Sequence, residues 1–180
     1  MIITLVRHGE VVEEYRGKYN GHIDIGLSQN GKLQAKELAK KLKSTAFDRV
    51  YCSDLLRAKE TLYELGLTQE VIYAEQLREK SWGRHEGKSF DEIVADGIEY
   101  ESFLQWLDAL DGQDINEYIK DVRNYFNSTI LKTKAKHILV VTHSGLIKTL
   151  LHLTNKISLQ EAFSKSLPYG SFVEINIKNL

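Results

Sequence analysis

Several residue types are scarce in this chain, and each shortage excludes a kind of protein. Cys52 is the only cysteine among 180 residues, which excludes an intramolecular disulfide framework and a multi-cysteine zinc site. No apolar run approaches the roughly 18 residues of a membrane-spanning helix. The N-terminal segment, MIITLVRHGE, lacks the basic start of a signal peptide. We therefore expect a cytoplasmic protein that does not enter a membrane.

Positive charge is missing from one stretch of the chain. The whole sequence is nearly neutral, with 24 Lys and Arg against 25 Asp and Glu, which argues against a nucleic-acid partner. Between Lys88 and Lys120, however, there is no Lys or Arg and there are nine acids, so the remainder carries 24 basic and 16 acidic residues, a net +8. The pattern predicts a basic body with an acidic insertion, and two well-solvated helices explain that charge at least as well as a functional use.

Proline and flexible linkers are also scarce. Pro168 is the only proline, and no Gly/Ser-rich linker or internal repeat is present. We expect a single domain over residues 1–180, with the insertion, or cap, at about residues 84–133.

Short apolar runs alternate with helical patterns. β-Branched runs predict strands at 2–6, 49–52, 137–142 and 171–177, and more weakly at 71–74. Two of them are continuously apolar, as in strands buried on both faces of a parallel sheet, while 171–177 alternates like an edge strand. Helices are predicted from Ser28 to about residue 43 with Leu33, Leu38 and Leu42 on one face, from Asp54 to Gly66, over 99–110 and 114–131, and from Ser144. This order predicts an α/β fold with a mainly parallel sheet and helices on both faces.

Charged and polar residues follow the three clearest strands. Arg7 and His8 come after the first, Arg57 lies one helical turn beyond the second, and His143 and Ser144 follow the third. Ligands bind beyond the carboxyl ends of parallel strands, where helix N-termini present backbone N–H groups. The sequence therefore predicts an anion pocket there, because arginine suits phosphate geometry.

The histidines suggest phosphoryl transfer. A neutral histidine is nucleophilic near pH 7, and two arginines beside His8 would hold its pKa down. His143 could act as a neutral donor or as a cation. Protonating the leaving oxygen requires another group, and either Glu79 or Glu86 could supply that proton.

Four sequence blocks carry a family resemblance. LVRHGE at 5–10, CSDLLRAKET at 52–61, LREKSWGRHEG at 77–87 and VVTHSG at 140–145 together resemble the histidine phosphatase superfamily, also called phosphoglycerate mutase-like. The resemblance implies a three-layer α/β/α sandwich with a small acidic helical cap. It also implies that no metal or other cofactor is needed and that the reaction passes through a phosphohistidine.

The resemblance also assigns roles to particular residues. His8 matches the nucleophile, His143 the second pocket histidine, and Glu79, rather than Glu86, the acid/base carboxylate. The predicted phosphate-binding residues are Arg7, Arg57, Asn20 and Ser144. Glu14 departs from the pattern, because small family members usually carry an asparagine there, and a carboxylate would repel phosphate unless it points away or meets a positive group of the substrate.

We therefore expect a phosphatase that acts on a small phosphomonoester, most similar in pattern to α-ribazole phosphatase-like proteins. Mutase-type phosphoryl transfer is an alternative, although the acidic insertion would serve a highly anionic ligand poorly. A non-catalytic phospholigand-binding protein is another. A metallohydrolase using the side chains of His8, His22, His85 and His143 is a third, but their spacing contains no local ligand motif. The oligomeric state stays open.

Overall fold

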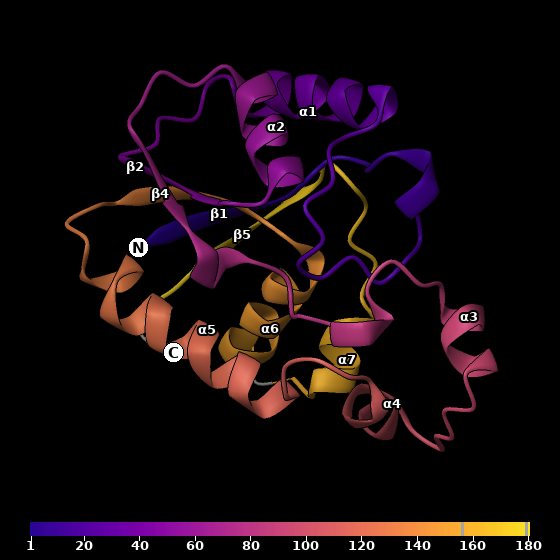
Figure 1. The fold of residues 1–180 in the computed structure, drawn as a ribbon. Helices are drawn as coiled ribbons and strands as arrows, with labels where there is room; N and C mark the ends of the chain where they lie inside the picture. The colour runs from indigo at the N-terminus through magenta and orange to yellow at the C-terminus, as the bar shows by residue number, and fades with distance from the viewer. Residues whose placement is uncertain (156, 179) are drawn as a thin grey trace.

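The computed structural model describes residues 1–155, 157–178 and 180, and its centre is a five-stranded sheet (Figure 1). The strand order is β3-β2-β4-β1-β5. The first four strands in this order run parallel, and β5 pairs antiparallel with β1 at one edge. The strands are β1 (Ile2–Arg7), β2 (Arg49–Ser53), β3 (Val71–Ala74), β4 (His137–Thr142) and β5 (Phe172–Asn176). All five predicted strands are thus confirmed, including the edge position of β5.

Helices cover both faces of this sheet and make it the middle of three layers, as Figure 1 shows. One face carries α1 (Gln29–Leu42) and α2 (Leu56–Leu65), and the other carries α5 (Ile115–Ser128) and α6 (Ser144–Asn155), with α7 (Leu159–Ser164) beyond α6. Two short helices, α3 (Phe90–Ala95) and α4 (Phe103–Ala109), lie to one side of these layers (Figure 1). The predicted three-layer α/β/α architecture is confirmed. No helix in these residues is long and apolar enough to cross a membrane.

The acidic segment between Lys88 and Lys120 is divided between two environments. Helix α5 belongs to the layer beneath the sheet, since Val122 and Phe126 pack in the same buried cluster as Ile3 and Ile138 of the strands. The rest of the acidic segment includes α3 and α4, which lie beside the three layers. Leu38, Leu62 and Val141 belong to a second cluster on the opposite face.

The helix predictions need four corrections. Asp54 does not open α2; Leu55 is its N-cap, because Asp54 pairs with Arg78 instead. Leu33 is 60% exposed, so it does not join Leu38 on the buried face of α1. The helix predicted at 99–110 begins only at Phe103. Helices α3 and α7 were not predicted, because six residues are too few to show a helical period.

The turn after β1 packs directly on the start of α1. The Ser28 hydroxyl accepts from Gly31 N at 2.9 Å, caps the helix, and donates to a Glu10 carboxylate oxygen at 2.8 Å. A Cβ on Gly31 would collide with the Glu10 carbonyl oxygen, and a Cβ on Gly9 would collide with the Gly31 carbonyl. Two glycines therefore permit the backbone contact that fixes the chain immediately after His8.

This close approach predicts that Gly31→Ala destabilises the protein, even though alanine is the better helix former by about 1 kcal/mol. We expect the free energy of unfolding to fall by about 1–3 kcal/mol, as for other overpacked contacts. Denaturant unfolding measures it, with Leu33→Ala on the same helix as a control that changes stability by no more than about 0.5 kcal/mol. A Gly31→Ala protein more stable than wild type would show that the turn can move away from α1.

Candidate functional site

The two pocket histidines lie side by side because β1 and β4 are neighbouring parallel strands. Arg7, the last residue of β1, is opposite Thr142, the last residue of β4. The residues that follow them, His8 and His143, therefore lie at the same edge of the sheet. The backbone N–H of His8 donates to the Thr142 carbonyl at 3.0 Å, and the ring centroids of His8 and His143 are 5.1 Å apart. Both side chains are buried.

One ring nitrogen of His8, Nε2, has no hydrogen-bond partner among the residues that the structure describes. The other, Nδ1, lies 2.8 Å from the Gly9 carbonyl oxygen, and a carbonyl only accepts, so Nδ1 carries the proton. Burial, followed by the positive charges of Arg57 and Arg7, holds the pKa of His8 well below its ordinary value. The ring is therefore neutral at pH 7, and the lone pair on Nε2 is available for nucleophilic attack.

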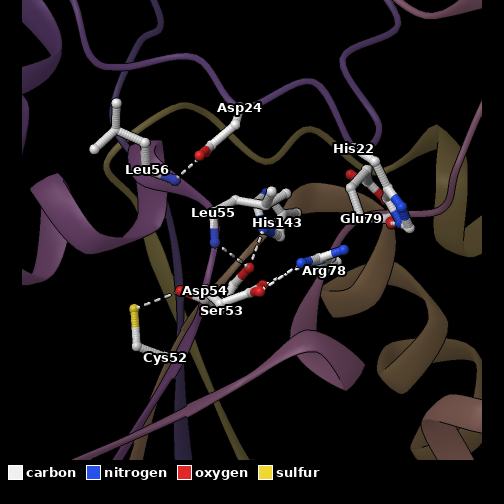
Figure 2. Close-up of polar contacts among 10 residues, drawn as sticks. All are labelled: His22, Asp24, Cys52, Ser53, Asp54, Leu55, Leu56, Arg78, Glu79 and His143. Carbon is white, nitrogen blue, oxygen red and sulfur yellow. Dashed lines mark hydrogen bonds and ion pairs between the residues drawn. The ribbon is translucent and has the colours of Figure 1, made fainter.

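His143 is held in the opposite tautomer. Arg57 Nε donates to its Nδ1 at 3.3 Å, which leaves the proton on Nε2, and Nε2 lies 2.8 Å from the Ser53 hydroxyl (Figure 2). Burial, and after it the charge of Arg57, holds the pKa of His143 well below its ordinary value. Of the two states considered from the sequence, the structure favours the neutral one.

Arg57 is a buried cation surrounded by carbonyl groups. Its guanidinium donates to the Ile23 carbonyl at 2.7 Å, and to the Asn20 and Gly21 carbonyls at 2.6 and 2.7 Å. Burial lowers its pKa to about 10, while the carboxylates of Glu79 and Asp24 oppose that effect. Arg57 is thus charged at neutral pH and also shapes the loop that contains Asn20.

Arg7 is placed by a residue that the sequence did not reveal. Its guanidinium stacks on the Tyr169 ring, 3.9 Å from the centroid, and donates to the Leu167 carbonyl. Its Nε is buried and has no hydrogen-bond partner among the described residues. The sequence pattern that indicates site residues is their position after a strand, and Tyr169 instead precedes β5. Since β5 runs antiparallel to β1, its beginning reaches the same edge.

Glu79 is oriented by two backbone N–H groups. One carboxylate oxygen accepts from Gly145 N at 2.8 Å, and the other accepts from Lys80 N at 3.1 Å. A Cβ at position 145 would collide with the carboxylate, so the glycine of the VVTHSG block makes room for it. The Glu79 carbonyl accepts from His22 Nε2 at 3.0 Å, and Figure 2 shows these two residues together.

The segment around Glu79 is tied to the ends of two strands. Arg78 makes a bidentate contact with Asp54, at 2.7 and 2.5 Å, next to the end of β2 (Figure 2). The Thr142 hydroxyl at the end of β4 donates to the Leu77 carbonyl at 2.7 Å. The Tyr118 hydroxyl of α5 donates to the Arg78 carbonyl at 3.1 Å. These contacts bring a carboxylate from a distant part of the sequence to the sheet edge.

Six of the seven predicted site residues line one cavity of about 360 Å³, which we call the central cavity. They are His8, Glu79, Arg7, Arg57, Asn20 and Ser144, and the lining also includes Lys18, Trp82 and Tyr169. His143 does not line it and reaches it through Arg57. The sequence does not indicate Lys18, because this residue lies between η1 (Glu13–Tyr15) and α1 and follows no strand directly.

Two of the predicted phosphate-binding residues differ in the N–H donors that they can offer to a ligand. Ser144 is the first residue of α6, where backbone N–H groups attract anions. The Asn20 amide nitrogen, in contrast, already donates to the Tyr15 carbonyl at 2.5 Å. An amide nitrogen carries two N–H donors, so the second N–H of Asn20 stays available to a ligand.

The alternative carboxylates lie elsewhere. Glu86 accepts from His22 N at 2.7 Å and from Trp82 N at 3.2 Å, and it thereby connects two loop segments. Glu86 is not one of the described residues that line the central cavity. Glu14 is exposed and does not line that cavity among the described residues either. Glu14 therefore contributes no carboxylate to the lining of the central cavity.

A metal site does not emerge from the predicted histidines. His85 is buried and its Nδ1 accepts from Asp111 N at 3.0 Å, so this ring nitrogen already has a partner in the protein. Within residues 1–155, 157–178 and 180, no group of three or more His, Cys, Asp or Glu side chains could hold a metal ion. The central cavity combines two arginines, a neutral histidine with a free lone pair and a carboxylate, which suits a phosphoryl group.

Comparisons with known proteins agree with this chemistry. A profile of the histidine phosphatase superfamily (branch 1) matches residues 3–179. The adenosylcobalamin/alpha-ribazole phosphatase of Salmonella typhimurium is 28% identical over 159 residues, covering 84% of this chain and 78% of that protein. The putative phosphoserine phosphatase 2 of Hydrogenobacter thermophilus is 27% identical, covering 98% of this chain and 89% of that protein.

A solved structure shares the fold. The alpha-ribazole phosphatase from Shigella flexneri superposes with a TM-score of 0.86 at 24% identity, covering 98% of this chain and 91% of that one. The family profile spans nearly the whole sequence, and the two similar sequences are named phosphatases. The chain therefore belongs to branch 1 of the histidine phosphatase superfamily and is a phosphatase of that superfamily.

Proposed function

We propose that this phosphatase hydrolyses a small phosphomonoester in two steps through a phosphohistidine on His8. In the first step His8 Nε2 bonds to phosphorus while the bond from phosphorus to the ester oxygen breaks. Glu79, in its acid form, gives a proton to that oxygen, so the alcohol leaves neutral. The positive charge that forms on the ring is stabilised by the Gly9 carbonyl, which accepts from Nδ1.

In the second step, water attacks phosphorus and the bond to His8 breaks. The Glu79 carboxylate accepts the proton of that water, inorganic phosphate leaves, and His8 returns to its neutral form. No metal ion or other cofactor takes part in this scheme. The observation that carries the proposal is the neutral His8 with a free Nε2, in a cavity that also contains two arginines and the Glu79 carboxylate.

The remaining site residues are assigned to the phosphoryl oxygens. Arg7 has a buried Nε without a partner among the described residues, so it can donate to an anion without losing an existing bond. Arg57, Ser144 and Asn20 donate to the other oxygens. His143 acts as a neutral group that orients Arg57 through Nδ1.

For the substrate, we propose α-ribazole 5′-phosphate, acted on in the cytoplasm. Support comes from the sequence pattern and from the similarity to the Salmonella typhimurium phosphatase. The relative named as a phosphoserine phosphatase makes phosphoserine the compound to compare directly. Mutase-type transfer is disfavoured, because the nine acids of the insertion would repel a highly anionic ligand.

Phosphate release from a panel of phosphomonoesters tests the proposal. In excess chelator, the wild-type protein is expected to release phosphate with α-ribazole 5′-phosphate preferred over phosphoserine and 3-phosphoglycerate, and His8→Ala to release none. Loss of activity in chelator would contradict a metal-independent reaction. Binding of phosphate without any turnover would favour the phospholigand-binding alternative.

Removing the acid/base group should slow turnover without preventing binding. We expect Glu79→Gln to lower kcat about 10²–10⁴-fold, the contribution typical of general acid–base catalysis. Glu86→Gln is the matched control and should retain most activity, because Glu86 bonds to a loop. If Glu79→Gln were as active as wild type across the pH range, the proton donor would have to be solvent and not Glu79.

The buried neutral histidines predict a dependence of stability on pH. Below about pH 6.5 the unfolded chain protonates its histidines, while His8 and His143 stay neutral in the folded protein because their pKa values are lowered. Stability is therefore lost as pH falls below about 6.5, by up to about 1.4 kcal/mol per pH unit for each histidine. Denaturant unfolding of wild type and His8→Asn should show a shallower slope for the variant. Equal slopes would show that His8 takes up a proton in the folded state.

A further inference from the structure

A smaller cavity adjoins the central one. It has a volume of about 190 Å³, and we call it the side cavity. Four residues line both cavities, namely Tyr19, Glu79, Trp82 and Ser144. The proposed proton donor therefore lies at the boundary between them. A phosphoryl group bound beside His8 places its ester oxygen near that boundary, and the rest of the alcohol must continue beyond it.

Five of the ten residues that line the side cavity are aromatic. Phe103 of α4 and Phe163 of α7 have ring centroids 5.5 Å apart. Trp106 donates from Nε1 to the Tyr19 hydroxyl at 2.9 Å, and the Tyr19 ring meets the Trp82 ring edge-on at 5.2 Å. A flat apolar group entering this space would exchange water for ring contacts.

One cation lies in this aromatic wall. Lys148 of α6 lines the side cavity and donates from Nζ to the Phe163 carbonyl at 2.8 Å. No carboxylate lies within ion-pair distance of it among the described residues, and an ammonium has three N–H donors, so two stay available. Burial, and after it the positive charge of Arg7, lowers the pKa of Lys148. An acceptor on the ligand would supply the missing partner.

A second neighbouring cavity is a weaker candidate for the alcohol. It measures about 500 Å³ and lies between η2 (Glu75–Leu77) and α5, but it shares only Glu79 with the central cavity. Nine of its twelve lining residues have polar or charged side chains, and Arg78 among them is already paired to Asp54. The side cavity shares four residues and offers apolar walls.

We propose that the side cavity is the leaving-group subsite, that it takes a flat apolar group, and that Lys148 selects alcohols bearing a hydrogen-bond acceptor, a carboxylate most strongly. This inference rests on the proposed function, because it assumes transfer to His8. It favours an alcohol with a ring system over a small polar alcohol such as serine.

Benzyl phosphate and ethyl phosphate test the apolar part, since both are esters of primary alcohols. We expect the wild-type kcat/KM to favour benzyl phosphate about tenfold to hundredfold, the effect of burying one aromatic ring. Phe103→Ala should reduce this ratio severalfold. Leu104→Ala, at a position 49% exposed on the same helix, should leave the ratio unchanged. Equal kcat/KM values for the two esters in wild type would overturn the subsite.

para-Carboxybenzyl phosphate tests the role of Lys148. The wild-type kcat/KM should favour it over benzyl phosphate by about tenfold, as for a hydrogen bond to a charged group. Lys148→Met keeps the aliphatic stem and should bring the ratio to about one. Lys165→Met, at an exposed position after α7, should keep the wild-type ratio. An unchanged ratio in Lys148→Met, or no preference in wild type, would overturn the assignment.

The two proposals fail in different ways. If wild type hydrolyses these esters and His8→Ala does not, but benzyl phosphate is not preferred, the subsite is wrong and the proposed reaction stands. If wild type releases phosphate from α-ribazole 5′-phosphate but from none of the three esters, the subsite is likewise wrong and the proposed reaction stands, whereas release from none of the four compounds contradicts both proposals.

Discussion

The parallel pairing of β1 with β4 is the contact on which the rest of the site depends. It sets Arg7 opposite Thr142, so that His8 and His143 emerge together at one edge of the sheet. The same strand ends hold the other components: Thr142 binds the Leu77 carbonyl, and β2 leads to the Asp54–Arg78 contact. A one-residue slip of β1 in this register would turn His8 to the opposite face, away from His143. Packing of the apolar strands against two helical layers fixes the register.

Burial gives this site its chemistry as well as its shape. Removing His8 and His143 from water, beside a cationic Arg57, disfavours their charged forms and preserves the His8 lone pair. Arg57 is itself buried, and it stays charged because the carbonyls of the loop at residues 20–23 and nearby carboxylates surround it. The conformation of that loop and the position of Arg57 at the central cavity therefore depend on the same hydrogen bonds.

Much of this arrangement could be predicted from the sequence. The continuously apolar runs predicted buried parallel strands, and parallel strands bring the residues that follow them to one edge, so the convergence of His8, Arg57 and His143 was foreseeable. Contacts that depend on tertiary geometry were not. Tyr169 reaches the site only because β5 runs antiparallel, and Asp54 abandons the helix N-cap for a bidentate partner 24 residues away. Exposure of the Leu33 side chain, in contrast, follows from the helical spacing itself, because five residues turn the helix by about 140° between Leu33 and Leu38.

The most direct test of the account is to capture the covalent intermediate. A radiolabelled aryl phosphate would be mixed with wild type and His8→Asn and quenched within one turnover, and labelled peptides would then be mapped. The account predicts label on His8 in wild type, stable in alkali and lost in acid as for a phosphohistidine, and none in His8→Asn. Turnover without labelled protein at any quench time, or label on another residue, would contradict it.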